Sequence, residues 1–356
     1  MHGNRRARSP NMDDRIRIGV DDARGRGVFA KAAIAPGTLV VRALPFALVP
    51  NDSCMLTHCC VCLACVADPV PCPRCASAVH CSRCADSAAL LHEDECAALC
   101  RLAAADDKLR STRSLRLLIR CLCARWRASC VAGDDANDDW WGEGDVVADE
   151  VEDIDVLVGP PEGEDDRLAP GDGSDDEDEQ RSGVMSVDLL EMAKQARYYA
   201  DSEMRIGHEA CAALMGQLCC NSLTIYGRGP GETSREVGVA LSASVAMFNH
   251  DCSANNADWA LDEDGCLVVR TSASVRPGQE LCLSYVDTRL PAATRQRRLR
   301  RHFFFDCQCV ACSAGTSRWT CALCATHNGP FDADCAGCRG ARFDAPVQKR
   351  KRASRQ

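Results

Sequence analysis

The chain has 356 residues, which is enough for two or three folding units with a sizeable core. Its 27 cysteines often form C-x2-C pairs, and no apolar leader follows the N-terminal MHGNRRARSP, so we expect zinc thiolates in a reducing compartment rather than disulfides. No run approaches about 18 consecutive apolar residues, and we therefore expect a soluble protein without a membrane-spanning helix.

The net charge of −9 conceals two regions of opposite sign. Residues 134–180 hold 21 Asp or Glu and a single basic residue, Arg167, whereas the rest of the chain holds 41 basic and 30 acidic residues. An acidic segment rich in Gly and Pro cannot bury enough apolar surface to offset its ordering entropy. We therefore predict a disordered acidic insert within a basic folded protein.

The first folded stretch, residues 13–58, alternates short β-rich runs with Gly and Pro turns. This alternation predicts a small β-rich unit. A G-x-G turn at residues 25–27 would by itself indicate only a hairpin, although glycine also lets a backbone approach a ligand closely.

Residues 59–96 carry paired metal-ligand residues. The pairs are Cys59 and Cys62, Cys72 and Cys75, Cys81 and Cys84, and His92 and Cys96. Eight donors in four pairs suit two tetrahedral zinc sites. Cys65 is a rival to Cys59 as the partner of Cys62. Zinc in so small a unit supplies folding free energy on the order of 10 kcal/mol, so the unit either only holds itself together or also contacts a peptide or DNA.

The following stretch, residues 97–216, is predicted to be helical outside its acidic part. Apolar residues recur at helical spacing before the acidic part, at Leu115, Leu118, Ile119 and Leu122. A second such set, Leu189, Met192 and Ala196, follows it. Arginines lie between the residues of the first set, and we interpret them as a solvated helix face rather than a nucleic-acid site.

The most informative stretch runs from Gln217 to Cys312. It contains CCNSLTIY, VALSASVAMFNHDCSANN, PGQELCLSY and FFFDCQCVAC in this order. Three features stand out: Asn-His before Asp-Cys, a Gly-Gln-Glu-Leu turn before an apolar strand that ends in Ser-Tyr, and C-x-C-x2-C close behind. Together they resemble the SET-domain lysine methyltransferases, and specifically the SET-MYND family.

The resemblance implies an α+β protein with a β-dominated SET domain of β-clip and pseudoknot topology. A MYND zinc finger and a helical insertion would interrupt this domain, and Cys-rich post-SET zinc sites would follow it. The implied units are the N-terminal part of the SET domain (13–58), the MYND finger (59–96), the helical insertion (97–216, with 134–180 acidic and disordered), the SET core (217–287), the post-SET motif (303–312), a zinc-ribbon-like segment (319–340) and a basic tail (341–356).

The implied reaction is S-adenosylmethionine-dependent N-methylation of a protein lysine, in a histone or another protein. The lysine amine has to be neutral, and deprotonating it near pH 7.4 costs roughly 4 kcal/mol. Burial beside a cationic sulfonium lowers the lysine pKa. The enzyme then contributes mainly alignment, which fits a sequence without a Ser-His-Asp or phosphate-loop pattern.

The resemblance also implies a cofactor site and one catalytic residue. Tyr285 matches a tyrosine whose hydroxyl lines the methyl-transfer pore, although taken alone it fits a buried residue at a strand end. Asn249 and His250 are expected at a crossover where one segment threads beneath another, and Asn221 on the strand before it. The implied cofactor-binding residues are Arg24, Arg26, Asn221, Asn249, His250, Tyr285 and Phe305.

Four metal-ligand sets are implied by the resemblance. Two interleave within the finger: Cys59, Cys62, Cys81 and Cys84, and Cys72, Cys75, His92 and Cys96, with the gap before Cys72 favouring Cys59 over Cys65. The third set is Cys252, Cys307, Cys309 and Cys312. The fourth, of ribbon type, is Cys321, Cys324, Cys335 and Cys338. Three zinc ions are therefore expected, or four if the ribbon binds one.

Two residues depart from the family pattern Asn-His-Ser-Cys-x-Pro-Asn. Asp251 stands in place of Ser, and Ala254 stands in place of Pro, which should loosen the turn. These departures keep a rival function open, a non-catalytic adaptor that binds partner peptides through the finger. A sequence-specific DNA-binding factor is a third option, but the sequence has no recognition-helix pattern.

The C-terminal sequence PVQKRKRASRQ is basic. Residues 349–352 fit a nuclear signal, a nucleic-acid contact or a solvated tail. We expect the protein in the nucleus, the cytoplasm or both, with a role at chromatin if the substrate is a histone. Direct nucleic-acid binding stays open at this point.

Overall fold

The computed structural model describes five main stretches of the chain and a few short pieces. The stretches are residues 11–21, 24–104, 112–132, 207–228 and 234–313, and the short pieces are 157, 159, 319–320, 324, 326–328 and 338. Within these residues, no helix combines the length and apolar character that crossing a bilayer requires.

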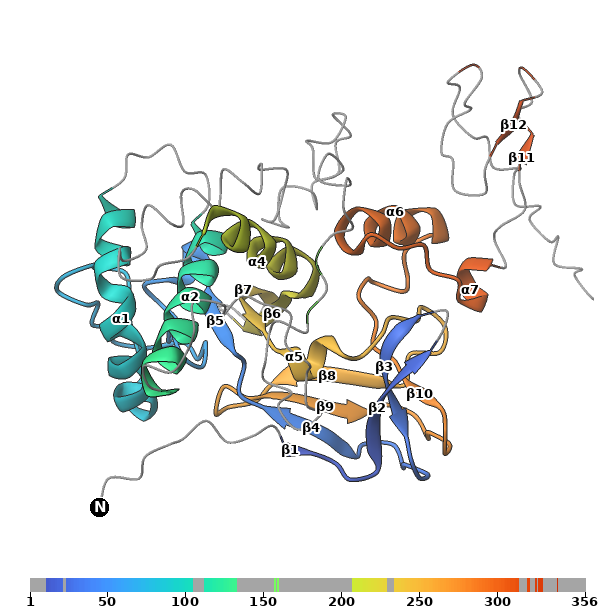
Figure 1. The fold of residues 1–356 in the computed structure, drawn as a ribbon, viewed down its shortest axis with the longest axis horizontal. Coiled ribbons are helices and arrows are strands. Elements are labelled where there is room, and N and C mark those ends of the chain that lie inside the picture. The colour runs from blue at the N-terminus through green and yellow to red at the C-terminus, as the bar shows by residue number, and fades with distance from the viewer. Residues whose placement is uncertain are drawn as a thin grey trace, which may run out of the picture.

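The strands of the described residues form small antiparallel sheets that join distant parts of the chain (Figure 1). The first sheet has the order β1 (Asn11–Met12), β4 (Leu39–Ala43), β9 (Leu267–Thr271), β8 (Ala257–Leu261). The second has the order β10 (Glu280–Leu281), β3 (Gly25–Ala30), β2 (Ile16–Asp21). The third has the order β5 (Ala47–Pro50), β7 (Ser234–Leu241), β6 (Leu223–Arg228), and β11 (Trp319–Thr320) pairs with β12 (His327–Asn328).

Each of the three larger sheets pairs a strand from the first 50 residues with a strand from residues 234–281. The N-terminal β-rich unit and the later core therefore form one β structure, and residues 51–222 are an insertion into it. A continuous apolar core lies between the sheets and the helices, with Phe248, Leu241, Leu267 and Leu281 completely buried. This arrangement is why the two halves of the sequence have to fold together.

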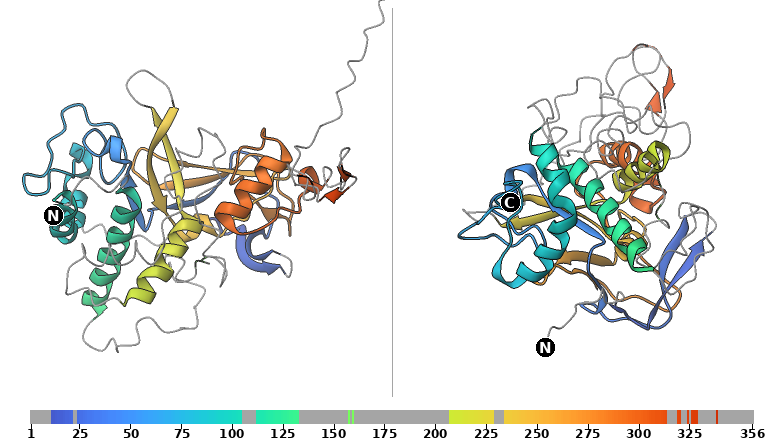
Figure 2. Two further views of the ribbon diagram at one scale, coloured as in Figure 1. Left: turned by 90° about the horizontal axis from the view of Figure 1, so that it is seen from above. Right: turned by 60° about the vertical axis from the view of Figure 1, so that its left-hand side comes forward.

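The helices cover two sides of the sheets (Figure 1). They are α1 (Ala85–Ala103), α2 (Arg113–Ala132), α4 (His208–Asn221), α5 (Ala243–Ala246), α6 (Ala292–Phe303) and α7 (Val310–Ser313), with the 3-10 turns η1 (Asp52–Cys54) and η2 (Ser82–Cys84). Helices α1 and α2 pack side by side, and α2 also packs against β5 and α4 (Figure 2). Helix α6 contacts α4.

Helix α2 confirms the predicted apolar repeat, because Leu115, Leu118, Ile119 and Leu122 are all buried. The prediction that its arginines form a solvated face is wrong. Four of them are buried: Arg113, Arg116, Arg120 and Arg125. The reason is that α1, β5 and α4 surround the helix, so carbonyl and carboxylate oxygens replace water as partners of these side chains. Arg116, for example, donates to the Pro50 carbonyl and to the Asp52 carboxylate, each at 2.7 Å.

Arg120 makes the contact that joins the cysteine-rich unit to the sheets. Its guanidinium forms a two-point ion pair with Glu95, with nitrogen–oxygen distances of 2.7 and 2.8 Å. It also donates to the carbonyls of Cys60, at 2.7 Å, and of Leu48 on β5. Both partners of the ion pair are buried. One side chain therefore fixes two parts of the cysteine-rich unit to β5.

The segment around His250 runs beside the strand end that leads to Tyr285. His250 and Leu283 form a parallel bridge, in which the Leu283 N–H donates to the Asn249 carbonyl and the Asp251 N–H donates to the Leu283 carbonyl. Parallel pairing of segments this close in sequence needs a connection that leaves the sheet and returns. Residues 257–271, which form β8 and β9, are that connection.

Several predictions fall outside the described residues. They concern the helical set at Leu189, Met192 and Ala196, the ligands Cys321 and Cys335, the basic tail and almost all of residues 134–180. Leu157 is an exception within the acidic segment, because it is buried in the main core and its carbonyl accepts a hydrogen bond from Gln217 at 3.0 Å. The prediction of disorder is therefore wrong at this residue.

Candidate functional site

Tyr285 lies at the centre of the crossover and is held at both ends. Its backbone N–H donates to His250 Nδ1 at 3.0 Å, and its hydroxyl donates to the Phe248 carbonyl at 2.6 Å. The centroids of the His250 and Tyr285 rings are 5.3 Å apart. Burial raises the pKa of the Tyr285 hydroxyl above its usual value, so the phenol is neutral across the physiological range. The ring therefore has a fixed orientation and a fixed protonation state.

His250 connects the tyrosine to a cysteine. Because Nδ1 accepts the Tyr285 N–H, the neutral ring carries its proton on Nε2, which lies 3.0 Å from Cys252 Sγ. Burial lowers the pKa of His250 to about 4, which keeps the ring neutral near pH 7. His250 thus acts as a rigid link between the strand end at Tyr285 and the thiol of Cys252.

Glu280 brings two of the predicted cofactor-site residues together, and sequence reasoning missed it. Its Oε2 accepts from Arg24 Nη1 and its Oε1 accepts from Asn249 Nδ2, each at 2.8 Å. Asn249 Nδ2 also donates to the Arg26 carbonyl at 2.8 Å, and Arg24 donates to the His250 carbonyl. The signal that could have identified Glu280 is its position in the Gly-Gln-Glu-Leu turn, which β10 places against β3.

The glycine at position 27 is required by this network. A Cβ at Gly27 would lie 2.4 Å from Glu280 Oε1 and 2.9 Å from Asn249 Nδ2, closer than packing allows. The close approach seen here is to side chains of the protein, and the approach of this turn to a cofactor stays a prediction. Arg26, between the two glycines, contributes its backbone carbonyl, while its side chain is exposed.

Two phenylalanines at the end of α6 cover Tyr285. The Phe303 ring is 4.8 Å from the Tyr285 ring, and Phe305 stands edge-on to Tyr285 at 6.4 Å and lies 6.1 Å from the His250 ring. Phe304 between them ends the helix with φ of 59°, a left-handed conformation that is uncommon for a bulky residue. This turn directs the chain from α6 towards the cysteines that follow.

Asn221 differs from its predicted position. It is the last residue of α4 and not part of a strand, because α4 buries Leu214, Met215 and Leu218 right up to its C-terminal turn before β6 begins at Leu223. Its amide donates to the Gln217 carbonyl at 2.8 Å, within the helix.

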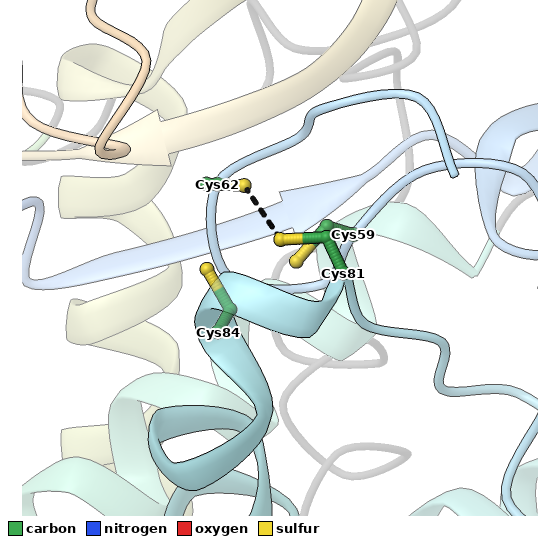
Figure 3. Close-up of side chains that lie close together, drawn as sticks. All are labelled: Cys59, Cys62, Cys81 and Cys84. Atoms are coloured by element: carbon green, nitrogen blue, oxygen red, sulfur yellow. Dashed lines mark hydrogen bonds between the residues drawn. The ribbon is translucent and has the colours of Figure 1, made fainter. Parts of the chain in front are cut away.

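The cysteine-rich unit gathers two sets of four ligand atoms, each within 4.8 Å of one another. The first set is Cys59, Cys62, Cys81 and Cys84 (Figure 3). The second set is Cys72, Cys75, His92 and Cys96. Four sulfur or nitrogen donors per set suit tetrahedral zinc. Cys65 is not in either set, because it is exposed and its backbone bridges to His58.

A third set links the crossover to the segment after α6. Its members are Cys252, Cys307, Cys309 and Cys312, all buried and again within 4.8 Å of one another. Burial opposes ionisation of Cys309, but hydrogen bonds from Ser253 and from Cys307 lower its pKa to about 7, which favours the thiolate that a metal binds. Four thiols fit zinc at this third cysteine centre as well.

Two residues of α6 support the third cysteine centre and were missed by sequence reasoning. Arg295 donates to two of its sulfurs, and Gln296 holds Cys307 by both ends of its amide, with distances of 2.6 Å to the carbonyl and 2.9 Å from the N–H. Both side chains are buried. The sequence gives little indication of this role, because both residues stand in the basic run ATRQRRLRRH.

The two departures at the crossover turn compensate each other. Asp251 Oδ1 accepts the backbone N–H groups of Ser253 and Ala254, each at 2.8 Å. Proline at position 254 would have no N–H to donate, so alanine supplies a hydrogen bond that the aspartate needs. The expectation of a loosened turn is therefore wrong, since a side chain fixes it instead of a proline ring.

The fourth predicted set is described only in part. Cys324 and Cys338 are exposed, while Cys321 and Cys335 lie outside the described residues. A zinc ribbon at this place stays a prediction.

Comparisons with known proteins decide the family. A family model of the SET domain matches residues 25–286, about three quarters of the chain. The chain belongs to the SET domain family. This match, with the paired β structure and the three ligand sets, confirms the predicted SET-type fold at the level of the domain.

Curated relatives support the SET-MYND resemblance. This chain is 23% identical over 291 residues to "Histone-lysine N-methyltransferase ASHR1" of Arabidopsis thaliana, covering 82% of the chain and 53% of that protein. It is 26% identical over 294 residues to "N-lysine methyltransferase SMYD2" of Gallus gallus, covering 82% of the chain and 58% of that protein. The chain thus spans about half the length of these relatives.

A shorter similarity to a named methyltransferase agrees with this family, and one solved structure also aligns with the chain. "Protein-lysine N-methyltransferase SMYD4" of Homo sapiens is 32% identical over 137 residues, which is 34% of this chain and 17% of that protein. The crystal structure of the SET domain of LSMT bound to lysine and AdoHcy aligns with 82% of this chain and 53% of its own, at 13% identity and a TM-score of 0.39. A score this low supports no conclusion about this protein.

Proposed function

We propose that this protein is an S-adenosylmethionine-dependent protein-lysine N-methyltransferase. One observation carries the proposal: in a chain of the SET domain family, the crossover places Asn249 and His250 beside Tyr285, through the His250–Leu283 bridge and the hydrogen bond from the Tyr285 N–H to His250. The named activities of the relatives point the same way.

The residues present fit such a cofactor. Asn249 offers an amide, Phe305 offers an aromatic face for an adenine ring, and the Phe248 and His250 carbonyls offer negative dipoles near a sulfonium. Arg24 is engaged by Glu280 and by the His250 carbonyl, so we assign it the role of holding the crossover in place. When bound, S-adenosylmethionine supplies an electrophilic methyl group.

Tyr285 would align the lysine amine with this methyl group. Its hydroxyl is held by the Phe248 carbonyl and its ring packs against Phe303 and Phe305, so the position of the ring is fixed. Alignment of this kind needs no protein nucleophile, and misplacement by about 1 Å costs roughly 100-fold in rate. The neutral phenol adds no charge that would stabilise the ammonium form of the substrate.

The first test is calorimetric titration of zinc-replete protein with S-adenosylmethionine and with its demethylated product. We expect saturable binding to one site per chain for both ligands, lost in Asn249→Ala. Folded protein that binds neither ligand would refute the proposal.

The second test compares two tyrosines. Tyr285→Phe should lower methyl transfer by about 100-fold while zinc content stays unchanged, because only the aligned hydroxyl is removed. Tyr226→Phe is the matched control, since Tyr226 is exposed on β6, and it should retain full activity. Full activity of Tyr285→Phe would rule out its assigned role.

We do not favour the adaptor function, because the chain belongs to the SET domain family, its relatives are named as lysine methyltransferases, and Asp251 fixes the crossover turn. For substrates we propose lysine-bearing proteins, with histones as one class, and for location the nucleus, the cytoplasm or both. A methylation screen of recombinant histones beside cytosolic extract, and imaging of tagged protein with and without residues 349–352, test these two points.

A further inference from the structure

The third cysteine centre, Cys252 with Cys307, Cys309 and Cys312, poses a charge problem. Four thiolates around one Zn²⁺ carry roughly two net negative charges. All four thiols are buried, with exposed fractions between 0% and 8%. Buried net charge costs several kcal/mol unless a partner offsets it. The structure should therefore provide an internal cation at this centre.

Arg295, in the first turns of α6, is placed to be that cation. Its Nε donates to Cys252 Sγ at 3.3 Å and its Nη2 donates to Cys312 Sγ at 3.5 Å. The remaining donors reach the carbonyls of Thr288, Leu290 and Ala311. The side chain is 6% exposed. All three nitrogens of the guanidinium thus donate hydrogen bonds, which go to two sulfurs and to backbone carbonyl oxygens.

The two sulfurs that Arg295 contacts come from different parts of the chain. Cys252 follows the crossover residue His250, whereas Cys312 lies on α7 beyond the phenylalanines that cover Tyr285. A planar guanidinium presents two N–H groups in fixed directions to two such acceptors, whereas a lysine ammonium is a compact charge on a flexible stem.

We propose that Arg295 is the charge-compensating residue of the third cysteine centre and that it sets how firmly this centre retains zinc. The role goes beyond methyl transfer, because metal retention does not depend on substrate or cofactor. Through Cys252 and Cys312, the same side chain holds the crossover against the segment after α6.

The finger centres support this assignment by contrast. Their sulfurs are approached by backbone N–H groups, from Val61 to Cys59 and from Arg74 to Cys72, each at 3.4 Å. The cation beside the first of them, Arg83, has a side chain that is 55% exposed. Each finger set also includes a partly exposed ligand, Cys81 in the first set and Cys72 and His92 in the second, whereas all four ligands of the third centre are buried. Water can therefore screen part of the charge at the finger, and at the third centre the buried arginine is the nearby cation.

Zinc release from the whole protein tests the proposal. Metal is measured with a chromogenic chelator under competition, and total zinc by mass spectrometry. Arg295→Met should weaken retention of one zinc per chain by about 10- to 100-fold, while both finger ions are released as in the wild type. Cys252→Ser identifies the phase that belongs to the third centre, because this variant should lack it.

The matched control is Arg289→Met. Arg289 precedes α6, has a side chain that is 88% exposed and pairs only weakly with Asp287, so its loss should not change zinc release. Cobalt substitution provides a second readout: an unchanged sulfur-to-cobalt charge-transfer band with weaker affinity shows that the ligands are intact and only their charge balance has changed. Unaltered zinc release by Arg295→Met would overturn the proposal.

Arg295→Lys separates charge from packing. It keeps the cation but lacks the planar fork that donates to both sulfurs in fixed directions, so zinc should be released faster than from wild type and more slowly than from Arg295→Met. Equal release by the lysine and methionine variants would overturn charge compensation. If Arg295→Met fails to fold, Arg295→Lys decides alone: selective release of one zinc supports the proposal, and wild-type release refutes it.

Discussion

The finger, residues 59–96, and the third cysteine centre use the same kind of ligand but gather them in different ways. All eight finger ligands come from one continuous stretch of the chain. The third centre combines Cys252 with cysteines that follow 55 to 60 residues later. Zinc in the finger can therefore stabilise a local unit, whereas zinc at the third centre would connect the crossover to the aromatic cover of Tyr285.

Their attachments to the rest of the molecule differ as well. The finger is joined to the sheets through the buried ion pair of Glu95 with Arg120, whose guanidinium also donates to the Leu48 carbonyl on β5. The third centre is joined through His250, which also holds the Tyr285 backbone. Loss of the Glu95–Arg120 ion pair should lower the stability of the fold, while loss of the His250 contacts should change the position of Tyr285 directly.

The largest effect is expected when one ligand is removed from each region. Cys252→Ser should lose one zinc and lower S-adenosylmethionine affinity by more than about 100-fold, because the crossover loses its anchor. Cys72→Ser, the same change in the finger, should also lose one zinc but leave the affinity within about threefold. Zinc analysis and calorimetry measure both. Equal loss of cofactor binding in the two variants would show that the regions do not differ in this way.

The next largest effect concerns the finger attachment. Arg120→Met leaves Glu95 buried without its partner and should lower the free energy of unfolding by about 3–5 kcal/mol. Arg127→Met removes another ion pair between α1 and α2, which Arg127 forms with Asp94 at a more exposed position, and should cost at most about 1 kcal/mol. Denaturant unfolding of the zinc-loaded proteins measures both values. Similar losses of unfolding free energy in the two variants would mean that the buried ion pair is not the main attachment of the finger to the sheets.

A smaller effect is expected at the crossover turn. Asp251→Ala removes the acceptor of two backbone N–H groups and should destabilise the turn by about 1–2 kcal/mol, seen as weaker cofactor binding. Adding Ala254→Pro should recover most of this loss, because proline fixes the turn and has no N–H to satisfy. In the wild-type background, Ala254→Pro alone should bring no gain. Additive effects of the two changes would disprove the compensation between them.

The sequence was sufficient for the features that depend on spacing. Paired cysteines, the Asn-His-Asp-Cys run and the apolar repeat of α2 predicted the ligand sets, the SET-domain family and a helix that the structure contains. Features that depend on tertiary burial were not predictable in this way. Arg120 and Arg295 look like surface residues in a basic run, and only packing on several sides makes them internal partners of Glu95 and of the thiols.

The same limit applies to Asn221 and to Asp251. The first was assigned to a strand by resemblance, but the apolar face of α4 extends the helix over it. The crossover turn at Asp251 was expected to be loosened by the loss of proline. The Asp251 side chain in fact stabilises the turn by hydrogen bonds, and these can be seen only in the folded structure. A single sequence shows which residue stands at a position, but the residue's effect on the structure depends on the groups that it contacts after folding.

The smallest effect is expected from the acidic segment, which differs from the rest of the chain in charge. We expect residues 134–180, attracted to the basic remainder of the protein, to compete with basic substrate tails at the mouth of the substrate channel. Replacing the six carboxylates of residues 172–179 by amides keeps the length of the chain and the buried Leu157. The Michaelis constant for a basic peptide should then change by a few-fold at low salt and converge with the wild-type value near 1 M salt, where charges are screened beyond about 3 Å. A Michaelis constant and a salt dependence that match the wild type would exclude such competition.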